Sequence, residues 1–217
     1  MRNSNLSNTE NVLFELIQNV DAMTYEQIKQ FLMKFMHCKE NVPKYIIHNL
    51  IRMRAIEATQ EDEEGYLLCG NSGYQTLANV NTDVVYAMYY LLDKAETMDD
   101  ILSLMTTNMN NVALAFILKG KLYEATMVEH NEMYKVEMTR KRYENELLKP
   151  EYARDDSIVP FHSVFMFAVR TDEEEDEILG KIEEMNLEIP HSIVIFRGKN
   201  PITKPDYTEY AINGNEE

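Results

Sequence analysis

Three consecutive helical patterns, followed by two short strand-like runs, fill the first seventy residues, and this order constrains the fold more than any other feature. The first helix is predicted over about Thr9–Asn19, where apolar residues recur at helical spacing and Ser7 or Asn8 supplies an N-cap. The second helix begins at Thr24, which forms a capping-box pair with Gln27. Both starts are local signals, so the helices are expected whatever the rest of the chain does.

The third helix begins at Asn41 and has Pro43 in its first turn, where a missing backbone N–H costs nothing. At about 100° per residue, its side chains divide into two faces. The apolar face holds Val42, Ile46, Ile47, Leu50, Ile51 and Met53. The opposite face carries basic, aromatic and amide side chains without a carboxylate: Lys44, Tyr45, His48, Asn49 and Arg52.

A β-hairpin is predicted directly after this helix. The runs Ile56–Thr59 and Tyr66–Cys69 flank a polar tip that ends in Gly65. Three helices and a hairpin form the order of a winged helix-turn-helix, whose third helix enters the major groove in members that bind DNA. The sequence therefore predicts a winged helix-turn-helix domain over residues 1–75, with its recognition helix after Asn41.

Six side chains on or just before the third helix are candidates for DNA binding. Arg52 can bond a guanine edge or a phosphate, and Asn49 can bond adenine through both amide atoms. Lys44, Tyr45 and His48 suit phosphate oxygens, and Lys39 adds a further positive charge. Residues 39–54 carry four basic side chains and one acidic side chain, a net charge of +3.

The charge of the whole chain opposes binding to a polyanion. The 217 residues include 37 acidic and 21 basic side chains, a formal net charge of −16. Four consecutive acidic residues in the hairpin tip, at positions 61–64, would also repel phosphate. Any DNA contact must therefore come from a local basic face. The alternative is that this face is only the solvated side of a surface helix, in a domain that binds proteins or dimerises.

Residues 80–212 are predicted to form a second, α/β domain, and residues 213–217 a disordered tail. An almost wholly apolar helix after Asn81 or Thr82 is expected to be buried. Strands are predicted at Val112–Leu118, Leu122–Val128, Tyr134–Met138, Ser163–Val169 and Ser192–Phe196. Arg140–Leu148 is either a charged helix or an extended arm, and Asp99–Met105 is helix or strand. An amphipathic helix at Ile178–Met185 between the last two strands indicates a βαβ-like crossover.

Motifs of metal, cofactor and nucleotide sites are missing from the sequence. Cys38 and Cys69 form no CxxC pair, the histidines are scattered, and no GxGxxG or GxxxxGK[ST] motif occurs. A restriction-type nuclease needs Glu-x-Lys on a strand, but Glu124 and Glu137 are each followed two residues later by threonine. We therefore expect no catalytic residue, no metal and no cofactor.

Two further features favour structural interpretations. His162 and His191 stand next to strand starts without an evident partner, and the acidic run Asp172–Glu177 suits the solvated start of a helix. The longest apolar run, Val84–Leu92, is far shorter than the roughly 20 residues of a membrane span. With no secretory signal visible, a cytoplasmic protein without membrane contact is expected.

The pattern as a whole resembles a protein family. The order of a winged helix, a buried helix, the strand pair around Ala115–Glu124, and the strand Phe165–Arg170 with an acidic helix resembles uncharacterised bacterial mobile-element proteins. These are similar to the plasmid replication-relaxation family. The resemblance extends from about Thr9 to Phe196. It implies a DNA-binding winged helix joined to an α/β domain with a restriction-nuclease-like central sheet, and a place in plasmid or conjugative biology.

The expected function is therefore non-enzymatic binding of double-stranded DNA in the replication, transfer or transcription control of a mobile element. The α/β domain would form a homodimer or recruit a replication or transfer protein. Two alternatives stay open at this point. One is a protein-interaction adaptor whose winged helix never touches DNA, and the other is a metal-dependent nuclease whose site is not visible in the sequence.

Overall fold

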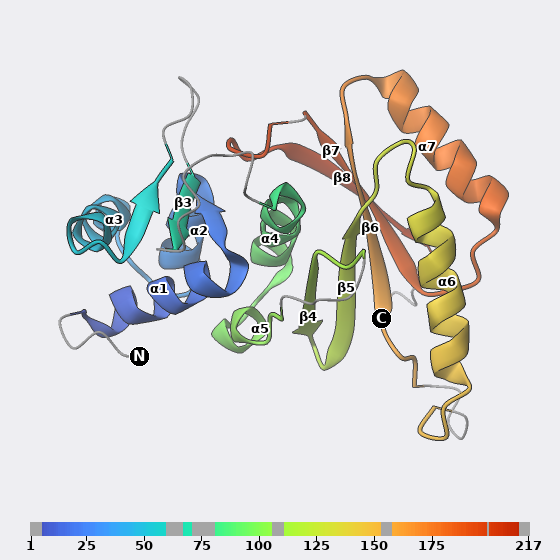
Figure 1. Ribbon diagram of the computed structural model, residues 1–217, viewed down its shortest axis with the longest axis horizontal. Coiled ribbons are helices and arrows are strands. Elements are labelled where there is room, and N and C mark those ends of the chain that lie inside the picture. The colour runs from blue at the N-terminus through green and yellow to red at the C-terminus, as the bar shows by residue number, and fades with distance from the viewer. Residues whose placement is uncertain are drawn as a thin grey trace. The chain divides into compact units, whose positions relative to one another are not determined.

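The computed structural model describes residues 6–59, 67–70, 81–105, 111–152, 158–198 and 200–212, and it has a mixed α+β fold (Figure 1). The chain divides into two compact units. The first unit comprises Met1–Thr106 with Asn200–Lys204, and the second comprises Thr107–Lys199 with Pro205–Glu217. Within the described residues, no helix is both long and apolar enough to cross a lipid bilayer.

The first unit begins with the predicted three helices and hairpin. Its elements are α1 (Asn8–Val20), β1 (Ala22–Thr24), α2 (Tyr25–Lys34), α3 (Val42–Arg52), β2 (Ile56–Ala58), β3 (Leu67–Gly70), α4 (Thr82–Lys94) and α5 (Met98–Leu102). The strands form an antiparallel sheet in the order β1-β3-β2. β1 was not predicted, because it is a three-residue segment defined by its pairing with the distant β3. The predicted hairpin tip at 60–65 and the connector at 71–80 lie outside the described residues.

The starts of the three helices confirm the capping predictions. Ser7 caps α1 in a capping box with Glu10, and Thr24 caps α2 in a second box with Gln27. Pro43 lies in the first turn of α3, as expected, although the side chain of Asn41 makes no capping bond. The short-range signals therefore predict where α1 and α2 begin, and Pro43 marks the first turn of α3.

α4 packs against α2 and β1, inside the first unit. The side chain of Gln27 donates to the Val85 carbonyl over 2.6 Å, and the hydroxyls of Thr24 and Tyr89 lie 2.8 Å apart. Nine consecutive residues of α4, Val84–Leu92, are buried, which confirms the expectation of a buried helix. The compact unit thus continues to residue 106, whereas the sequence placed a domain boundary between residues 75 and 80. These contacts across the expected boundary explain the difference.

The second unit is a five-stranded mixed sheet with two long helices. Its elements are β4 (Leu114–Leu118), β5 (Lys121–Met127), α6 (Tyr134–Leu147), β6 (His162–Val169), α7 (Asp172–Met185), β7 (His191–Arg197) and β8 (Asp206–Ile212). The order is β4-β5-β6-β7-β8, in which β5, β6 and β7 are parallel and both outer strands are antiparallel to their neighbours. The sequence correctly predicted the β4–β5 hairpin, where Lys119 and Gly120 both have positive φ, as a tight two-residue hairpin turn requires. The β6–α7–β7 crossover is confirmed as well.

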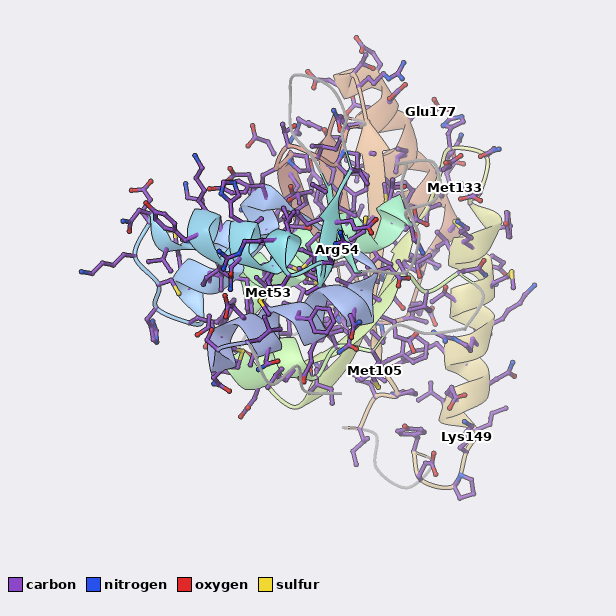
Figure 2. All side chains as sticks on the ribbon, turned by 60° about the vertical axis from the view of Figure 1, so that its left-hand side comes forward. Met53, Arg54, Met105, Met133, Lys149 and Glu177 are labelled. Atoms are coloured by element: carbon purple, nitrogen blue, oxygen red, sulfur yellow. The ribbon has the colours of Figure 1, made fainter. Side chains whose placement is uncertain are left out.

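Two predictions for this unit were wrong or incomplete. Tyr134–Met138 is not a strand but the first part of α6, because Val136, Thr139 and Tyr143 are buried at helical spacing while Tyr134 and Met138 are exposed. The helical alternative for Arg140–Leu148 is correct, and Figure 2 shows Met133 and Lys149 at the two ends of this helix. β8 was not predicted. The expected tail at 213–217 lies outside the described residues.

α6 and α7 lie on the same side of the five-stranded sheet (Figure 1) and cover a continuous apolar core. The strands contribute Phe165, Phe167, Val169, Ile193 and Ile195, and the helices contribute Val136, Tyr143, Ile178 and Ile182. The acidic run opens α7, where Thr171 is the N-cap and four acids occupy the first turn. This confirms its interpretation as a helix start, where negative side chains stabilise the positive end of the helix dipole.

Candidate nucleic-acid interface

α3 presents one polar face to solvent. The helix buries Pro43, Ile47 and Leu50 against the first unit. Four of the six predicted DNA-binding side chains are exposed on its opposite face, namely Lys44, Tyr45, His48 and Arg52. Tyr45 has 70% of its surface accessible, so its ring and hydroxyl face solvent. Lys39, the fifth, is also exposed, in the segment before the helix.

Three basic side chains on or just before α3 make no polar side-chain contact of their own among the residues that the structure describes. Lys39, Lys44 and His48 form no ion pair or side-chain hydrogen bond with another described residue. Met53 and Arg54 form the turn that ends α3 (Figure 2). The backbone of Arg54 is in the left-handed region there, with a φ of 56°. As far as the described residues are concerned, these three basic side chains are available to a ligand.

Asn49, the sixth predicted residue, has a different environment. It is half-buried, and its amide nitrogen donates to Oε1 of Glu10 on α1 over 2.5 Å. Its amide oxygen accepts from Nη2 of Arg52 over 2.6 Å. A bidentate contact with adenine needs both the amide nitrogen and the amide oxygen. Both are already engaged inside the first unit, so Asn49 links Glu10 to Arg52.

Glu10 is a member of this site that sequence reasoning missed. Only 8% of the residue is exposed, and its Oε2 accepts from the Ser7 backbone N–H over 2.8 Å. Burial opposes ionisation, but the hydrogen bonds from Asn49 and Ser7 and the charge of Arg52 outweigh it and hold the pKa of Glu10 below its ordinary value. The Ser-x-x-Glu spacing predicts only the capping role of Glu10, because the contact with Asn49 joins residues 39 positions apart.

A second group of lysines in the first unit lines a groove of about 400 Å³ beside α2, with Met33 in its wall. These lysines are committed to internal contacts. Lys34 donates to the carbonyls of Leu92 and Asp93 at the end of α4, and Lys204 pairs with the Asp93 carboxylate over 2.7 Å. Lys29 lies 3.6 Å from Glu40. The α3 face is therefore the better candidate for an anionic ligand.

In the second unit, arginines hold the two carboxylates that a nuclease would have needed. Glu124 on β5 is buried and pairs with Arg142 of α6, whose guanidinium lies 4.4 Å from the centre of the Phe161 ring. Glu137 bonds to Arg140 over 2.6 and 2.9 Å. Among the residues that the structure describes, no group of three His, Cys, Asp or Glu side chains could hold a metal ion.

The two histidines of the parallel strands are buried in the sheet. His162 Nε2 lies 3.0 Å from the Ser192 hydroxyl, and its ring contacts Tyr123. Burial, assisted by the charge of Lys121, lowers the pKa of His162 to about 4. Nδ1 of His191 lies 2.7 Å from the Ile189 carbonyl, and burial lowers the pKa of this histidine as well. Both side chains have internal partners at strand starts, consistent with the structural roles expected of them.

No protein-family model matches the chain, and no curated protein matches it with significance. The resemblance to the replication-relaxation family therefore stays a prediction from the sequence.

Proposed function

We propose that this protein binds double-stranded DNA through the exposed face of α3 and does so without catalysing a reaction. The observation that carries the proposal is the composition of that face. Lys44, Tyr45, His48 and Arg52 project from one side of a helix whose other side is buried, and no carboxylate lies among them. Such side chains bond phosphates and base edges.

The topology of the first unit supports the same proposal. Its order α1-β1-α2-α3-β2-β3, with β3 between β1 and β2, agrees with the winged helix-turn-helix expected from the sequence. In that fold the third helix is the one that enters the major groove. The short strand β1 strengthens the assignment, because it pairs with β3 and completes the small sheet.

The proposed binding is local and electrostatic. The face belongs to a chain of net charge −16, so the rest of the surface repels a polyanion. Within residues 39–53, the full positive charges are those of Lys39, Lys44 and Arg52. The affinity should thus be modest and should fall steeply as salt rises, because each phosphate contact releases counterions.

Removing Lys44 and Arg52 together tests the proposal. We expect Lys44→Ala/Arg52→Ala to weaken duplex binding by about 10-fold or more at moderate salt, and to make the slope of log K against log salt less negative by about 1, from the lost phosphate contact of Lys44. Fluorescence anisotropy with a labelled duplex measures both quantities.

The matched control is Lys141→Ala/Arg170→Ala, which removes one lysine and one arginine from exposed positions of the second unit. This control should bind within about 2-fold of the wild type, because only contacting charges change the salt slope. Equal losses in the two double variants would show that net charge, and not the α3 face, governs binding.

The biological setting that we propose follows the resemblance: a plasmid or conjugative element, with DNA binding serving replication, transfer or transcription control. The second unit, whose five-stranded sheet the resemblance implies to be restriction-nuclease-like, would then join two copies of the chain or recruit a replication or transfer protein. A two-fold DNA site would be expected of a homodimer.

One observation favours the adaptor alternative over DNA binding. Asn49 and Arg52 are bonded to each other, and Glu10 places a carboxylate behind them, which reduces the positive potential of the face. An adaptor would show no binding to duplex DNA even at low salt, whereas its partner would be a protein that covers Tyr45. The anisotropy experiment separates the two functions directly.

A further inference from the structure

The hydrogen-bonded series Glu10–Asn49–Arg52 extends from a buried carboxylate to an exposed guanidinium. We propose that Arg52 is the base-reading residue of α3, that the base it reads is guanine, and that Asn49 and Glu10 are its positioning residues. This inference rests on the proposed function, since it requires that α3 enters the major groove. It replaces the expectation that Asn49 itself reads adenine.

The hydrogen-bonding capacity of each group supports this division of roles. A guanidinium has five N–H donors, and the bond to Asn49 uses one of them. The remaining donors are enough for the bidentate contact with O6 and N7 of guanine, the commonest specific contact of arginine in the major groove. Asn49 uses one amide N–H on Glu10 and one lone pair of its amide oxygen on Arg52, and these two bonds orient its amide toward its neighbours on the protein.

The electrostatics of the series favour the same assignment. Glu10 is buried and charged, and it accepts from Asn49 and from the Ser7 backbone, so its position is fixed by α1. Asn49, held by Glu10, in turn accepts a hydrogen bond from the guanidinium of Arg52 and so orients a side chain that is otherwise exposed. An arginine that is already oriented loses less conformational freedom when it binds, and this sharpens the discrimination between bases.

The experiment is a selection from a pool of duplexes with a randomised core, carried out with the wild type and five variants. The wild type should enrich sites that contain a fixed guanine. Arg52→Ala should lower the preference for that guanine by about 10-fold or more. Asn49→Ala and Glu10→Gln should weaken the preference at the same base pair while the rest of the site is retained.

Two control variants separate positioning from stability and from charge. Ser7→Ala removes the hydroxyl that caps α1 but leaves the Glu10–Asn49 bond, so it should keep the guanine preference even if the fold is less stable. Lys44→Ala should lower the affinity for all sequences alike, since a phosphate contact carries no base information.

Two outcomes would overturn the inference and leave the proposed function standing. In one, the wild type binds duplex DNA in a salt-dependent way but enriches no base. In the other, Asn49→Ala and Glu10→Gln leave the guanine preference intact, or Asn49→Ala abolishes an adenine elsewhere in the site. Absence of duplex binding at every salt concentration would instead contradict the proposed function itself.

Discussion

Arg142→Ala is expected to lower the free energy of unfolding by about 3 kcal/mol, because it leaves a buried carboxylate without its cation. Glu124 lies on β5 with 6% of its surface exposed, and Arg142 of α6 is its ion-pair partner. The guanidinium also contacts the face of the Phe161 ring, so the substitution removes a second attraction. The loss should therefore exceed that of an ordinary surface ion pair.

Urea unfolding of a double-mutant cycle measures this effect. In the background of Glu124→Gln, Arg142→Ala should cost much less, because no charge is then left buried. Arg140→Ala is the matched control. Its partner Glu137 is part-exposed, and removing such a solvent-screened pair should cost much less than removing the buried one. A loss for Arg142→Ala no larger than that of the control would contradict the buried-pair explanation.

Acidification should destabilise the fold through His162 well before most carboxylates protonate. The pKa of this histidine is about 4 in the folded protein, against an ordinary value of 6.5. Between these pH values the unfolded chain binds a proton that the folded chain does not, so stability falls as the pH drops from 6.5 towards 4. The shift corresponds to a loss of about 3 kcal/mol once the pH is below both values.

The comparison of His162→Gln with the wild type isolates this contribution, because changes in net charge act on both proteins alike. The variant should lose less stability between pH 6.5 and 4, as measured by urea unfolding at each pH. Parallel pH profiles for the wild type and His162→Gln would refute the assignment.

Much of the first unit could be predicted from the sequence because its signals are local. The capping pairs Ser7–Glu10 and Thr24–Gln27 and the position of Pro43 are set within one turn of each helix. β1 could not be predicted, because three residues carry no periodicity and their strand character depends on pairing with β3. The placement of α4 in the first unit likewise depends on contacts across more than fifty residues.

In the second unit, too, elements with a clear local sequence pattern could be predicted, whereas elements defined by tertiary packing could not. The β4–β5 hairpin and the strands β6 and β7 are dense apolar runs, which the sequence displays directly. In contrast, Tyr134, Val136 and Met138 alternate as a strand would, and only the burial of Thr139 and Tyr143 on one side shows that they belong to a helix. The described side chains of β8, at 206–210, are exposed or part-exposed, and the sequence there has no apolar run that would reveal a strand.

The sequence predicts which side chains lie on the exposed face of α3, but it does not predict the hydrogen bonds that link them to α1. Helical periodicity alone placed Lys44, Tyr45, His48 and Arg52 on the exposed side of α3. The engagement of Asn49 was not predictable, since Glu10 approaches it from α1 across a tertiary contact. That contact changes the role proposed for Asn49, from reading adenine to positioning Arg52.

The most direct test of the account is a salt titration of duplex binding by the wild-type protein. If Lys39 and Lys44 contact phosphates while Arg52 contacts a base edge, log K should fall linearly with log salt with a slope of about −2. Binding that does not depend on salt, or no binding at low salt, would contradict the claim that the α3 face meets DNA.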